Sequence, residues 1–314
     1  MMRIVSLLPS ATELICSLGL ADSLVGVSHE CDYPAAVKSL PAVTRSAINP
    51  QMTSQEIDQA VRQQLKTEQA LYHLRMDVLE ALKPDLIVTQ ALCDVCAVAA
   101  SEVEAAACAL PGQARVINLE PMRLSEVFDT LTLLGEATGI SKRAQEVRAQ
   151  LEHRVQLVSA RSATLAEQDK LRVAFLEWIE PLFNAGHWTP ELIELAGGVD
   201  CLGNKHQPSQ SLPDNAIRES APDVLFIAEC GFDETRSAQD LPALSRLPGW
   251  PRLPCVVKER LYFCDGNAYF SRPGPRLVDS LELIAHTLYP ELHPLPNHLQ
   301  PAQRFDRRGI PAAG

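Results

Sequence analysis

The chain has 314 residues, of which 46% are hydrophobic and 21% charged, and its formal net charge is −11. This composition is typical of a globular protein, and the length suits two domains of ordinary size. The acidic balance argues against nucleic acid or an anionic membrane surface as the main partner. No run of about 18 or more apolar residues is present, so we expect no membrane span.

The first residues and the cysteines indicate the cellular compartment of the protein. Met1-Met2-Arg3 runs directly into an apolar segment, and no cleavage site of small residues follows it. The nine cysteines are scattered along the chain, which favours reduced thiols in a protein of this length. We therefore expect a cytoplasmic protein, or a periplasmic one if a signal segment has been trimmed from its start.

Strand and helix patterns alternate through residues 1–121, which we expect to form an N-terminal lobe. Apolar runs predict strands at residues 4–8, 24–27, 86–89 and 115–119. Capping boxes predict helices that start at Ser10 and at Thr53, and Gly19 marks the end of the first. Strands that alternate with helices predict a parallel sheet covered on both faces.

Residues 122–168 show a different pattern. Apolar residues recur at steps of three and four from Leu124 to Val158, which predicts one long connecting helix or two helices that meet near Gly139. Strand and helix patterns return in residues 169–289, the expected C-terminal lobe. Residues 290–314 are rich in proline, and we expect this tail to pack loosely or be disordered.

Three short segments of the first lobe recur in the second lobe in the same order. The matching pairs are residues 3–8 with 172–177, 13–22 with 191–200, and 84–88 with 222–226. Together they predict an α/β protein of two related Rossmann-like lobes with parallel sheets, joined by a long helix. Such lobes can open and close a cleft by a rocking motion.

Open parallel sheets bind ligands beyond the carboxyl ends of their strands. Aromatic, imidazole and polar residues gather at the predicted strand ends, and we take these as candidate ligand-binding residues: Pro9, Ser10, His29, Glu30, Asp32, Tyr33, Gln90, Trp178, His187, Trp188, Phe232, Asn267, Tyr269, Phe270 and Arg272. Aromatic rings supply rigid apolar walls, and a few polar groups orient the guest. We therefore expect a large, partly apolar ligand between the lobes.

Several of these residues also have a purely structural explanation. His29 could satisfy a buried carbonyl group, and Arg272 could pair with Asp279. Trp188 could be core packing beside Thr189, which resembles a helix N-cap followed by proline. The sequence leaves these alternatives open.

The pair Cys93-x-x-Cys96 follows a predicted strand and allows two chemical roles. A metal ion could be held if His29, Cys31 and Cys230 converge on the pair from neighbouring strand ends. A redox role is also possible, because a helix N-terminus lowers the pKa of a thiol. A second closely spaced ligand pair, which is usual in structural zinc sites, is missing, so packing or ligand contact remains the commoner explanation.

The usual enzyme signatures are absent from the sequence. It contains no glycine-rich dinucleotide fingerprint after a strand, no phosphate-binding loop, no zinc-protease motif and no nucleophile elbow. A binding protein is therefore favoured over an enzyme. A redox or hydrolytic enzyme that uses cysteine and histidine side chains in the cleft stays an alternative.

Several segments resemble a known family. Residues 6–14, 24–28 and 32–34 resemble the opening of the periplasmic cobalamin-binding proteins. Residues 84–88 and 272–276 are similar to the mid-lobe strand and the last helix entry of that family. The resemblance covers about residues 3 to 288, and the strand that follows Pro84-Asp85 is shared with the wider group that binds iron–siderophores and haem.

The resemblance implies two Rossmann-like lobes joined by a long helix, with a ligand held between them by strand-end loops. By position it implies contacts from Pro9-Ser10, Asp32-Tyr33, Trp188 and residues 269–272. It also implies docking on an ABC permease through one surface glutamate per lobe, which the sequence does not identify. Our leading expectation is a protein that binds cobalamin or a related corrinoid, as the substrate-binding component of an ABC importer.

This sequence departs from the family in having no evident signal peptide and in adding His29-Glu30-Cys31, Cys93, Cys96 and His187 at the strand ends. These departures argue against a transport role and leave open an intracellular protein that binds a corrinoid or another metal complex. The alternative is a cytosolic protein that binds haem, an iron complex or a metal ion through cysteine and histidine side chains.

Overall fold

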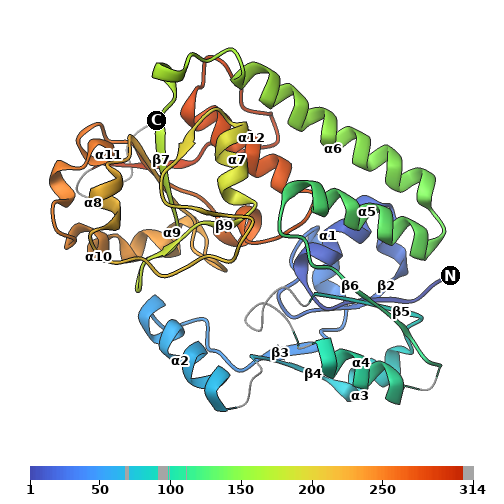
Figure 1. Cartoon of the computed structure of the whole chain (residues 1–314). Coiled ribbons are helices and arrows are strands. Elements are labelled where there is room, and N and C mark those ends of the chain that lie inside the picture. The colour runs from blue at the N-terminus through green and yellow to red at the C-terminus, as the bar shows by residue number, and fades with distance from the viewer. Residues whose placement is uncertain (68–70, 91–97, 99, 111, 307–314) are drawn as a thin grey trace. The chain divides into compact units, whose positions relative to one another are not determined.

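The structure is a computed structural model that describes the whole chain except residues 68–70, 91–97, 99, 111 and 307–314. The chain forms two compact units (Figure 1). Unit 1 comprises Met1–Pro121 and Ser125–Ala149, and unit 2 comprises Met122–Leu124 and Gln150–Gly314. Each unit is built on a mainly parallel sheet with helices around it, so the predicted α/β class is confirmed.

Unit 1 contains a four-stranded parallel sheet with the strand order β2-β1-β5-β6. These strands are β1 (Ile4–Ser6), β2 (Leu24–Val27), β5 (Leu86–Thr89) and β6 (Arg115–Asn118). A separate antiparallel hairpin pairs β3 (Thr44–Ser46) with β4 (Tyr72–Leu74). The helices are α1 (Pro9–Ser17), α2 (Ser54–Thr67), α3 (Met76–Leu82), α4 (Ala100–Ala109) and α5 (Leu124–Thr138), with short 3₁₀ turns at Ala21–Ser23 and Ala35–Ser39.

The core of unit 1 forms because β1 and β5 are apolar on both faces, as parallel strands usually are. Val5 and Ile87 lie in the middle of the sheet and are fully buried. They pack in one cluster with Leu79 of α3 and Val103 of α4. This packing holds the sheet in place against α3 and α4. It therefore also determines where the carboxyl ends of the strands lie.

Two helices connect the α/β parts of the chain. The sequence allowed either one long helix or two helices that meet near Gly139, and the second alternative is confirmed. After α5 comes α6 (Ser141–Ser162), whose residues to Ala149 belong to unit 1 and whose later residues belong to unit 2. Gly139 lies between the two helices with φ +76, a left-handed conformation that glycine adopts without strain. A Cβ atom at Gly135 would lie 2.4 Å from that of Ala144, so only glycine allows the helices to approach here.

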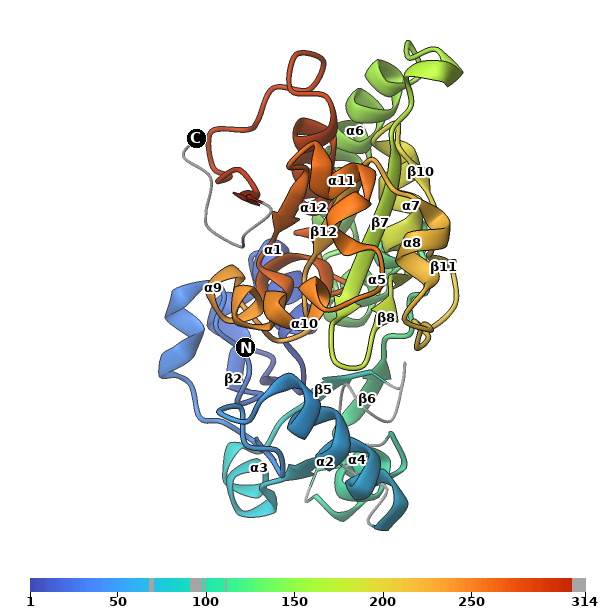
Figure 2. The same cartoon turned by 90° about the vertical axis from the view of Figure 1, so that its left-hand side faces the viewer.

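Unit 2 contains a sheet with the order β10-β7-β12-β13-β14, in which β8 also pairs with β7. The strands of unit 2 are β7 (Arg172–Trp178), β8 (Phe183–Asn184), β9 (Gly186–His187), β10 (Val199–Asp200), β11 (Asn204–Lys205), β12 (Val224–Ile227), β13 (Leu261–Phe263) and β14 (Gln303–Phe305). Figure 2 shows β7 and β12 side by side at the centre of this sheet. Strands β9 and β11 form a separate parallel pair.

The helices of unit 2 are short except for the last. They are α7 (Thr189–Leu195), α8 (Ala216–Ser220), α9 (Glu234–Ser237), α10 (Leu241–Ser245), α11 (Pro254–Val257) and α12 (Leu277–Leu288), with 3₁₀ turns at Glu167–Asp169, Ala238–Asp240 and Trp250–Arg252 and a π-helical turn at Gly266–Phe270. Helix α12 packs against α7 (Figure 1). One face of the sheet packs in a cluster that contains Leu176, Ile227 and Phe263.

The internal similarity of the sequence corresponds to a repeated topology. The order β2-β1-β5-β6 in unit 1 matches β10-β7-β12-β13 in unit 2, and all of these neighbours are parallel. In each unit the strand that follows the Pro-Asp pair lies next to the unit's first strand. The two matching strand orders confirm two Rossmann-like α/β parts.

The repeated Pro-Asp pair has the same physical role in both units. The Asp85 carboxylate accepts the backbone N–H of Arg3 at 2.7 Å, and the Asp223 carboxylate accepts that of Arg172 at 3.2 Å. An N–H at the start of a strand would otherwise lack a protein acceptor. Each Pro-Asp pair therefore fixes where the first strand of its unit begins.

The predicted capping boxes have different outcomes. At the second, the Thr53 N–H donates to Glu56 Oε2 at 2.9 Å and the Glu56 N–H donates to Thr53 Oγ1 at 3.2 Å, which confirms the box. The box expected at Ser10 is wrong, because α1 already begins at Pro9 with Leu8 as its N-cap. The Thr12 hydroxyl is buried and donates to Ser6 Oγ instead.

The expectation of a loosely packed tail is wrong for its described part, which reaches residue 306. Strand β14 pairs antiparallel with β13 and brings Phe305 opposite Leu261. Phe305 is 2% exposed, and its ring contacts that of Phe263 edge-on with centroids 4.6 Å apart. The prolines of this segment predicted irregular structure, but burial of the Phe305 side chain anchors the segment to the core of unit 2.

We predict that Phe305→Ala lowers the free energy of unfolding by about 3 kcal/mol, because it leaves a cavity against the core of unit 2. Urea unfolding followed by circular dichroism measures this change. Arg304→Ala is the matched control in the same strand. Arg304 is exposed, and its side chain bonds to the Glu259 carbonyl oxygen, so its removal should cost about 1 kcal/mol or less. Equal losses in the two variants would contradict a core role for the tail.

Candidate ligand-binding residues in each unit

In unit 1, the candidate residues follow the ends of β1, β2 and β5, as the sequence predicted. Pro9 and Ser10 open α1 directly after β1, and Gln90 is buried directly after β5. Asp32 and Tyr33 lie in the loop after β2, where the Tyr33 side chain is 49% exposed. An exposed aromatic ring at a strand end is available to a ligand.

His29 and Glu30 of the same loop are held by side chains of the β3–β4 hairpin. His29 Nδ1 lies 2.7 Å from Thr44 Oγ1, which also accepts the backbone N–H of His29 at 3.1 Å. The Tyr72 hydroxyl donates to Glu30 Oε1 at 2.9 Å, and the Tyr72 ring lies 5.5 Å from that of His29. Partial burial lowers the pKa of His29, while the nearby Glu30 charge acts in the opposite sense. The imidazole therefore favours its neutral form.

The thiol of Cys31 lies in a chain of hydroxyl groups. Thr12 Oγ1 donates to Ser6 Oγ at 2.8 Å, and Ser6 Oγ donates to the Leu8 carbonyl oxygen at 3.0 Å. Cys31 Sγ lies 3.1 Å from Thr12 Oγ1. Either atom can be the donor in this contact, and the thiol is buried within the group of hydroxyls.

The predicted metal set of His29, Cys31, Cys93, Cys96 and Cys230 gains no support. Cys93 and Cys96 lie outside the described residues. Among the residues that are described, no group of three close metal donors includes His29, Cys31 or Cys230. Cys31 is buried beside the Thr12 hydroxyl, and Cys230 is exposed in unit 2.

One group of three potential metal donors does occur in the described part of the chain: Asp279, Glu282 and His298. Both of its carboxylates already pair with one guanidinium group from α6. Arg154 Nη2 lies 2.5 Å from Asp279 Oδ1 and 2.6 Å from Glu282 Oε2. This arrangement joins α6 to α12 within unit 2, and we assign it a structural role.

In unit 2, two aromatic candidates come together at the ends of β7 and β12. The rings of Trp178 and Phe232 have centroids 5.1 Å apart. Trp178 Nε1 donates to the Glu180 carbonyl oxygen at 3.0 Å, and the Arg236 guanidinium lies 4.2 Å from the Phe232 ring centre. Phe232 is buried beneath the Arg236 cation, whereas Trp178 remains partly exposed, so Trp178 is the ring of this pair that a ligand can reach.

Asn267, Tyr269 and Arg272 lie in or just after the π-helical turn that follows β13. The Asp265 carboxylate begins this turn by accepting the Ala268 N–H at 2.6 Å. Arg272 is buried and donates to Asn267 Oδ1 at 2.8 Å. The Asn267 N–H donates to the Phe232 carbonyl oxygen at 3.2 Å, so this turn is anchored to the backbone of the residue that packs against Trp178.

Trp188 and Phe270 are buried and support this turn from within unit 2. Trp188 Nε1 donates to the Phe270 carbonyl oxygen at 2.9 Å, and the Phe270 ring packs 4.9 Å from that of Phe175. His187 stacks beside Trp188 in a left-handed conformation, with φ +52, and burial lowers its pKa. Thr189 is not the N-cap of α7, because Trp188 takes that position without a side-chain cap.

Two buried carboxyl groups at strand ends were not among the candidates. Glu177 is the last residue but one of β7 and accepts the Gly186 N–H at 3.0 Å, and burial raises its pKa to about 7. Glu229 comes two residues after β12, accepts the Ile179 N–H at 3.2 Å, and has a pKa raised to about 8 by burial. The available signal was a glutamate at the carboxyl end of an apolar run, where the carboxyl group stays in a buried environment.

Glu229 also lies at a point of close backbone approach. A Cβ atom at Gly266 would lie 2.2 Å from the Glu229 carbonyl oxygen, so only glycine fits there. The Glu229 Oε2 atom is buried, and among the residues that the structure describes it has no hydrogen-bond partner. A neutral carboxyl group is therefore the stable form at this position near neutral pH.

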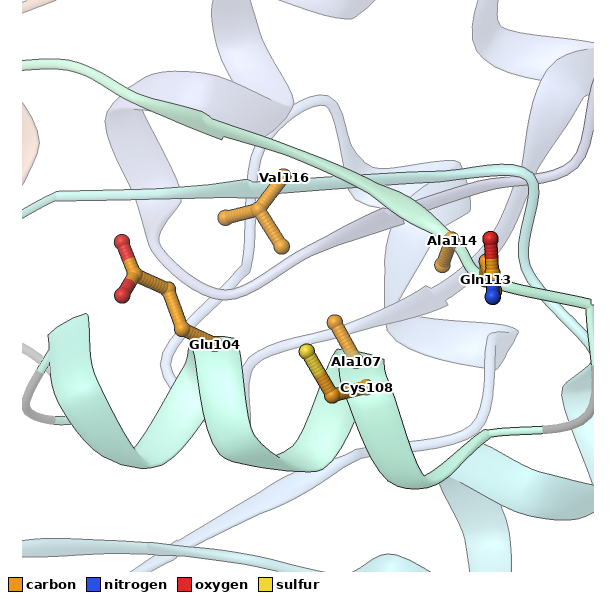
Figure 3. Close-up of a pocket in the computed structure, with 6 residues that line it drawn as sticks. All are labelled: Glu104, Ala107, Cys108, Gln113, Ala114 and Val116. Carbon is orange, nitrogen blue, oxygen red and sulfur yellow. The ribbon is translucent and has the colours of Figure 1, made fainter.

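A separate pocket lies in unit 1 between α4 and the edge strand β6. It is lined by Glu104, Ala107, Cys108, Gln113, Ala114 and Val116 (Figure 3). Figure 3 shows the Glu104 and Cys108 side chains on one side of the pocket and Val116 on the other. None of the candidate residues belongs to it, and buried polar groups do not converge in it, so it is a surface groove rather than a built ligand site.

The comparisons with known proteins give one consistent result. A family model described as periplasmic binding protein matches residues 4–268. An ABC transporter substrate-binding lipoprotein of Bacillus subtilis, itself uncharacterised, is 24% identical over 299 residues, which are 92% of this chain and 80% of that protein. A vitamin B12-binding protein of Vibrio cholerae is 22% identical over 284 residues, or 90% of this chain and 87% of the relative.

Solved structures agree with the fold. The apo form of a periplasmic haem-binding protein from Roseiflexus superimposes with a TM-score of 0.69 and 22% identity, and covers 93% of this chain and 99% of its own. At this identity the match establishes the fold alone. Within the described residues, no helix combines the length and apolar character that a bilayer crossing requires.

We predict that the stability of the protein falls as pH rises through the range in which Glu229 titrates. The folded-state pKa of about 8 lies above the ordinary value of 4.5, so between these values the folded chain holds a proton that the unfolded chain has lost. Glu229→Gln stays neutral and should lose less stability between about pH 5 and about pH 8.5, by up to a few kcal/mol. Thermal and urea unfolding at several pH values measure the difference.

Glu219→Gln is the control, because Glu219 is an exposed carboxylate of the same unit. It should leave the pH dependence unchanged. If Glu229→Gln has the same pH profile as the wild type, the buried carboxyl is not protonated in the folded protein.

Proposed function

We propose that this chain, which belongs to the periplasmic binding protein family, is the substrate-binding component of an ABC importer. The support is the family match over residues 4–268 and the alignment of most of the chain with a substrate-binding lipoprotein of an ABC transporter. A substrate-binding component presents its ligand to a membrane permease. That permease is the partner we propose for this chain.

We further propose that the ligand is cobalamin or a related corrinoid. One relative is a vitamin B12-binding protein and one structural neighbour is a haem-binding protein. Both ligands are large, flat macrocycles with a metal at the centre. The observation in this chain that carries the proposal is the partly exposed Trp178 ring at the end of β7, which packs against Phe232 with the Arg236 cation nearby, since an aromatic face suits a macrocycle and a cation suits its polar edge.

The proposed contacts come from both units and correspond to the strand-end residues found in the sequence. From unit 1 we propose Pro9, Ser10, His29, Glu30, Asp32, Tyr33 and Gln90, and from unit 2 Trp178, His187, Trp188, Phe232, Asn267, Tyr269, Phe270 and Arg272. The buried Trp188 and Phe270 would act mainly by positioning the π-helical turn. Partly exposed rings such as Trp178 and Tyr33 would contact the ligand directly.

The proposed role places the protein outside the cytoplasmic membrane. The relatives are described as periplasmic proteins or as lipoproteins, and this supports the second of the two locations considered from the sequence. The comparisons give no support to a cytoplasmic location. The same relatives support a small-molecule ligand rather than a bare metal ion.

We predict that calorimetric titration of the protein gives a 1:1 complex with vitamin B12 at a Kd of about 1 µM or tighter. Trp178→Ala and Tyr33→Ala, one in each unit, should each weaken binding by about tenfold or more, because aromatic contacts usually dominate such interfaces. Leu157→Ala is the control, since Leu157 is an exposed apolar residue of α6 outside the candidate set.

The same titration with haemin and with ferric siderophores decides among the ligands of the family. Tighter binding of one of these than of vitamin B12 would overturn the corrinoid assignment and leave the importer role standing. No binding of any of them up to about 50 µM would contradict both proposals.

A further inference from the structure

The hydroxyl group of Thr44 determines which nitrogen of His29 carries the proton. A hydroxyl has one proton to donate and two lone pairs that accept. Thr44 donates its proton to Ser28 Oγ at 3.1 Å and accepts the His29 backbone N–H at 3.1 Å. Its one remaining lone pair faces His29 Nδ1 at 2.7 Å. His29 Nδ1 must therefore be the donor in this contact.

In a neutral imidazole, a proton on Nδ1 leaves Nε2 as an unprotonated nitrogen with a free lone pair. Within the described part of the chain, His29 Nε2 has no hydrogen-bond or ion-pair partner, and the side chain is exposed. An imidazole whose Nδ1–H is bound to an oxygen acceptor and whose Nε2 is free has the arrangement typical of a histidine that binds a metal.

The ring is also held in one orientation. Its Nδ1 atom bonds to the first residue of β3, and its face contacts the ring of Tyr72 at the start of β4. Tyr72 is itself fixed by its hydrogen bond to Glu30. The polar contacts of His29 thus come from the β3–β4 hairpin, while the backbone that carries it follows the end of β2. Such a preorganised ring loses little conformational entropy when it binds.

The surroundings of His29 do not suit a bare metal ion. A stable site for a bare ion needs three or four protein ligands, and the described residues place no further pair of donors around His29. A single imidazole is sufficient when the metal already has four ligands from a macrocycle and needs only an axial one.

We propose that His29 Nε2 is the axial ligand of the metal in the bound macrocycle, which is a corrinoid whose axial position is occupied by exchangeable water. On binding, the bond between cobalt and the water oxygen breaks, a bond between cobalt and Nε2 forms, and one water molecule is released. The oxidation state of the metal does not change. This inference rests on the proposed function, since it presupposes a metal-centred ligand.

The test compares two cobalamins that differ at the axial position. Aquacobalamin carries an exchangeable water, whereas cyanocobalamin carries cyanide at the same place. The wild type should shift the visible bands of aquacobalamin to those of an imidazole complex. His29→Gln should abolish this shift and weaken aquacobalamin binding by about tenfold or more, with a change of about threefold or less for cyanocobalamin.

Two further variants separate ligation from a structural role. Thr44→Val removes the Nδ1 acceptor and should weaken aquacobalamin binding while leaving a residual spectral shift, because Thr44 is a positioning residue. His73→Ala changes another histidine of the same hairpin and should leave both spectrum and affinity unaltered. In the His29→Ala variant, added imidazole should restore the shifted spectrum.

The outcomes distinguish the inference from the function on which it rests. Binding of both cobalamins with no shift in the wild type, or an equal loss of affinity for both in His29→Gln, would overturn the axial role and leave the corrinoid function standing. A shift with haemin and none with aquacobalamin would overturn the corrinoid as the source of the metal. Failure of the wild type to bind either cobalamin would remove the corrinoid function on which the inference rests, and the importer role would fall as well only if haemin and ferric siderophores also failed to bind.

Discussion

The parallel order of the strands is the constraint on which the rest of this protein depends. In each unit the same order brings the carboxyl ends of three or more strands to one edge of the sheet. The side chains that follow β1, β2 and β5, or β7, β12 and β13, are therefore neighbours although they are far apart in the sequence. Asp85 and Asp223 set the starting point of the first strand in each unit, and this fixes the place at which it ends.

At the edge of the unit 1 sheet, two threonine hydroxyl groups hold neighbouring residues of the loop after β2. Thr12 Oγ1 lies 3.1 Å from the buried Cys31 thiol. Thr44 has donated its proton to Ser28 and accepts that of His29 Nδ1, which leaves His29 Nε2 free. The imidazole is exposed while the thiol is buried, so the nitrogen is the donor that this loop presents to a metal-centred ligand.

Long apolar runs made the strands predictable, since residues 24–27 and 86–89 are strands in the structure as they were in the sequence. The start of α1 was misjudged because Pro9 takes the first helical position, with Leu8 as an N-cap that has no side-chain hydrogen bond, so the helix begins before Ser10. The tail was misjudged because the antiparallel pairing of Phe305 is a long-range contact with no local signal. The sequence placed His29 at a strand end, but its tautomer depends on Thr44, fifteen residues away.

The central claim is that this chain binds a metal-centred macrocycle through residues at its strand ends. The most direct measurement is the visible spectrum of the protein after incubation with aquacobalamin, cyanocobalamin, haemin and ferric siderophores in turn, each followed by gel filtration. The account predicts a coloured 1:1 complex with both cobalamins, with shifted bands only for aquacobalamin. A protein fraction that stays colourless with every compound would contradict it.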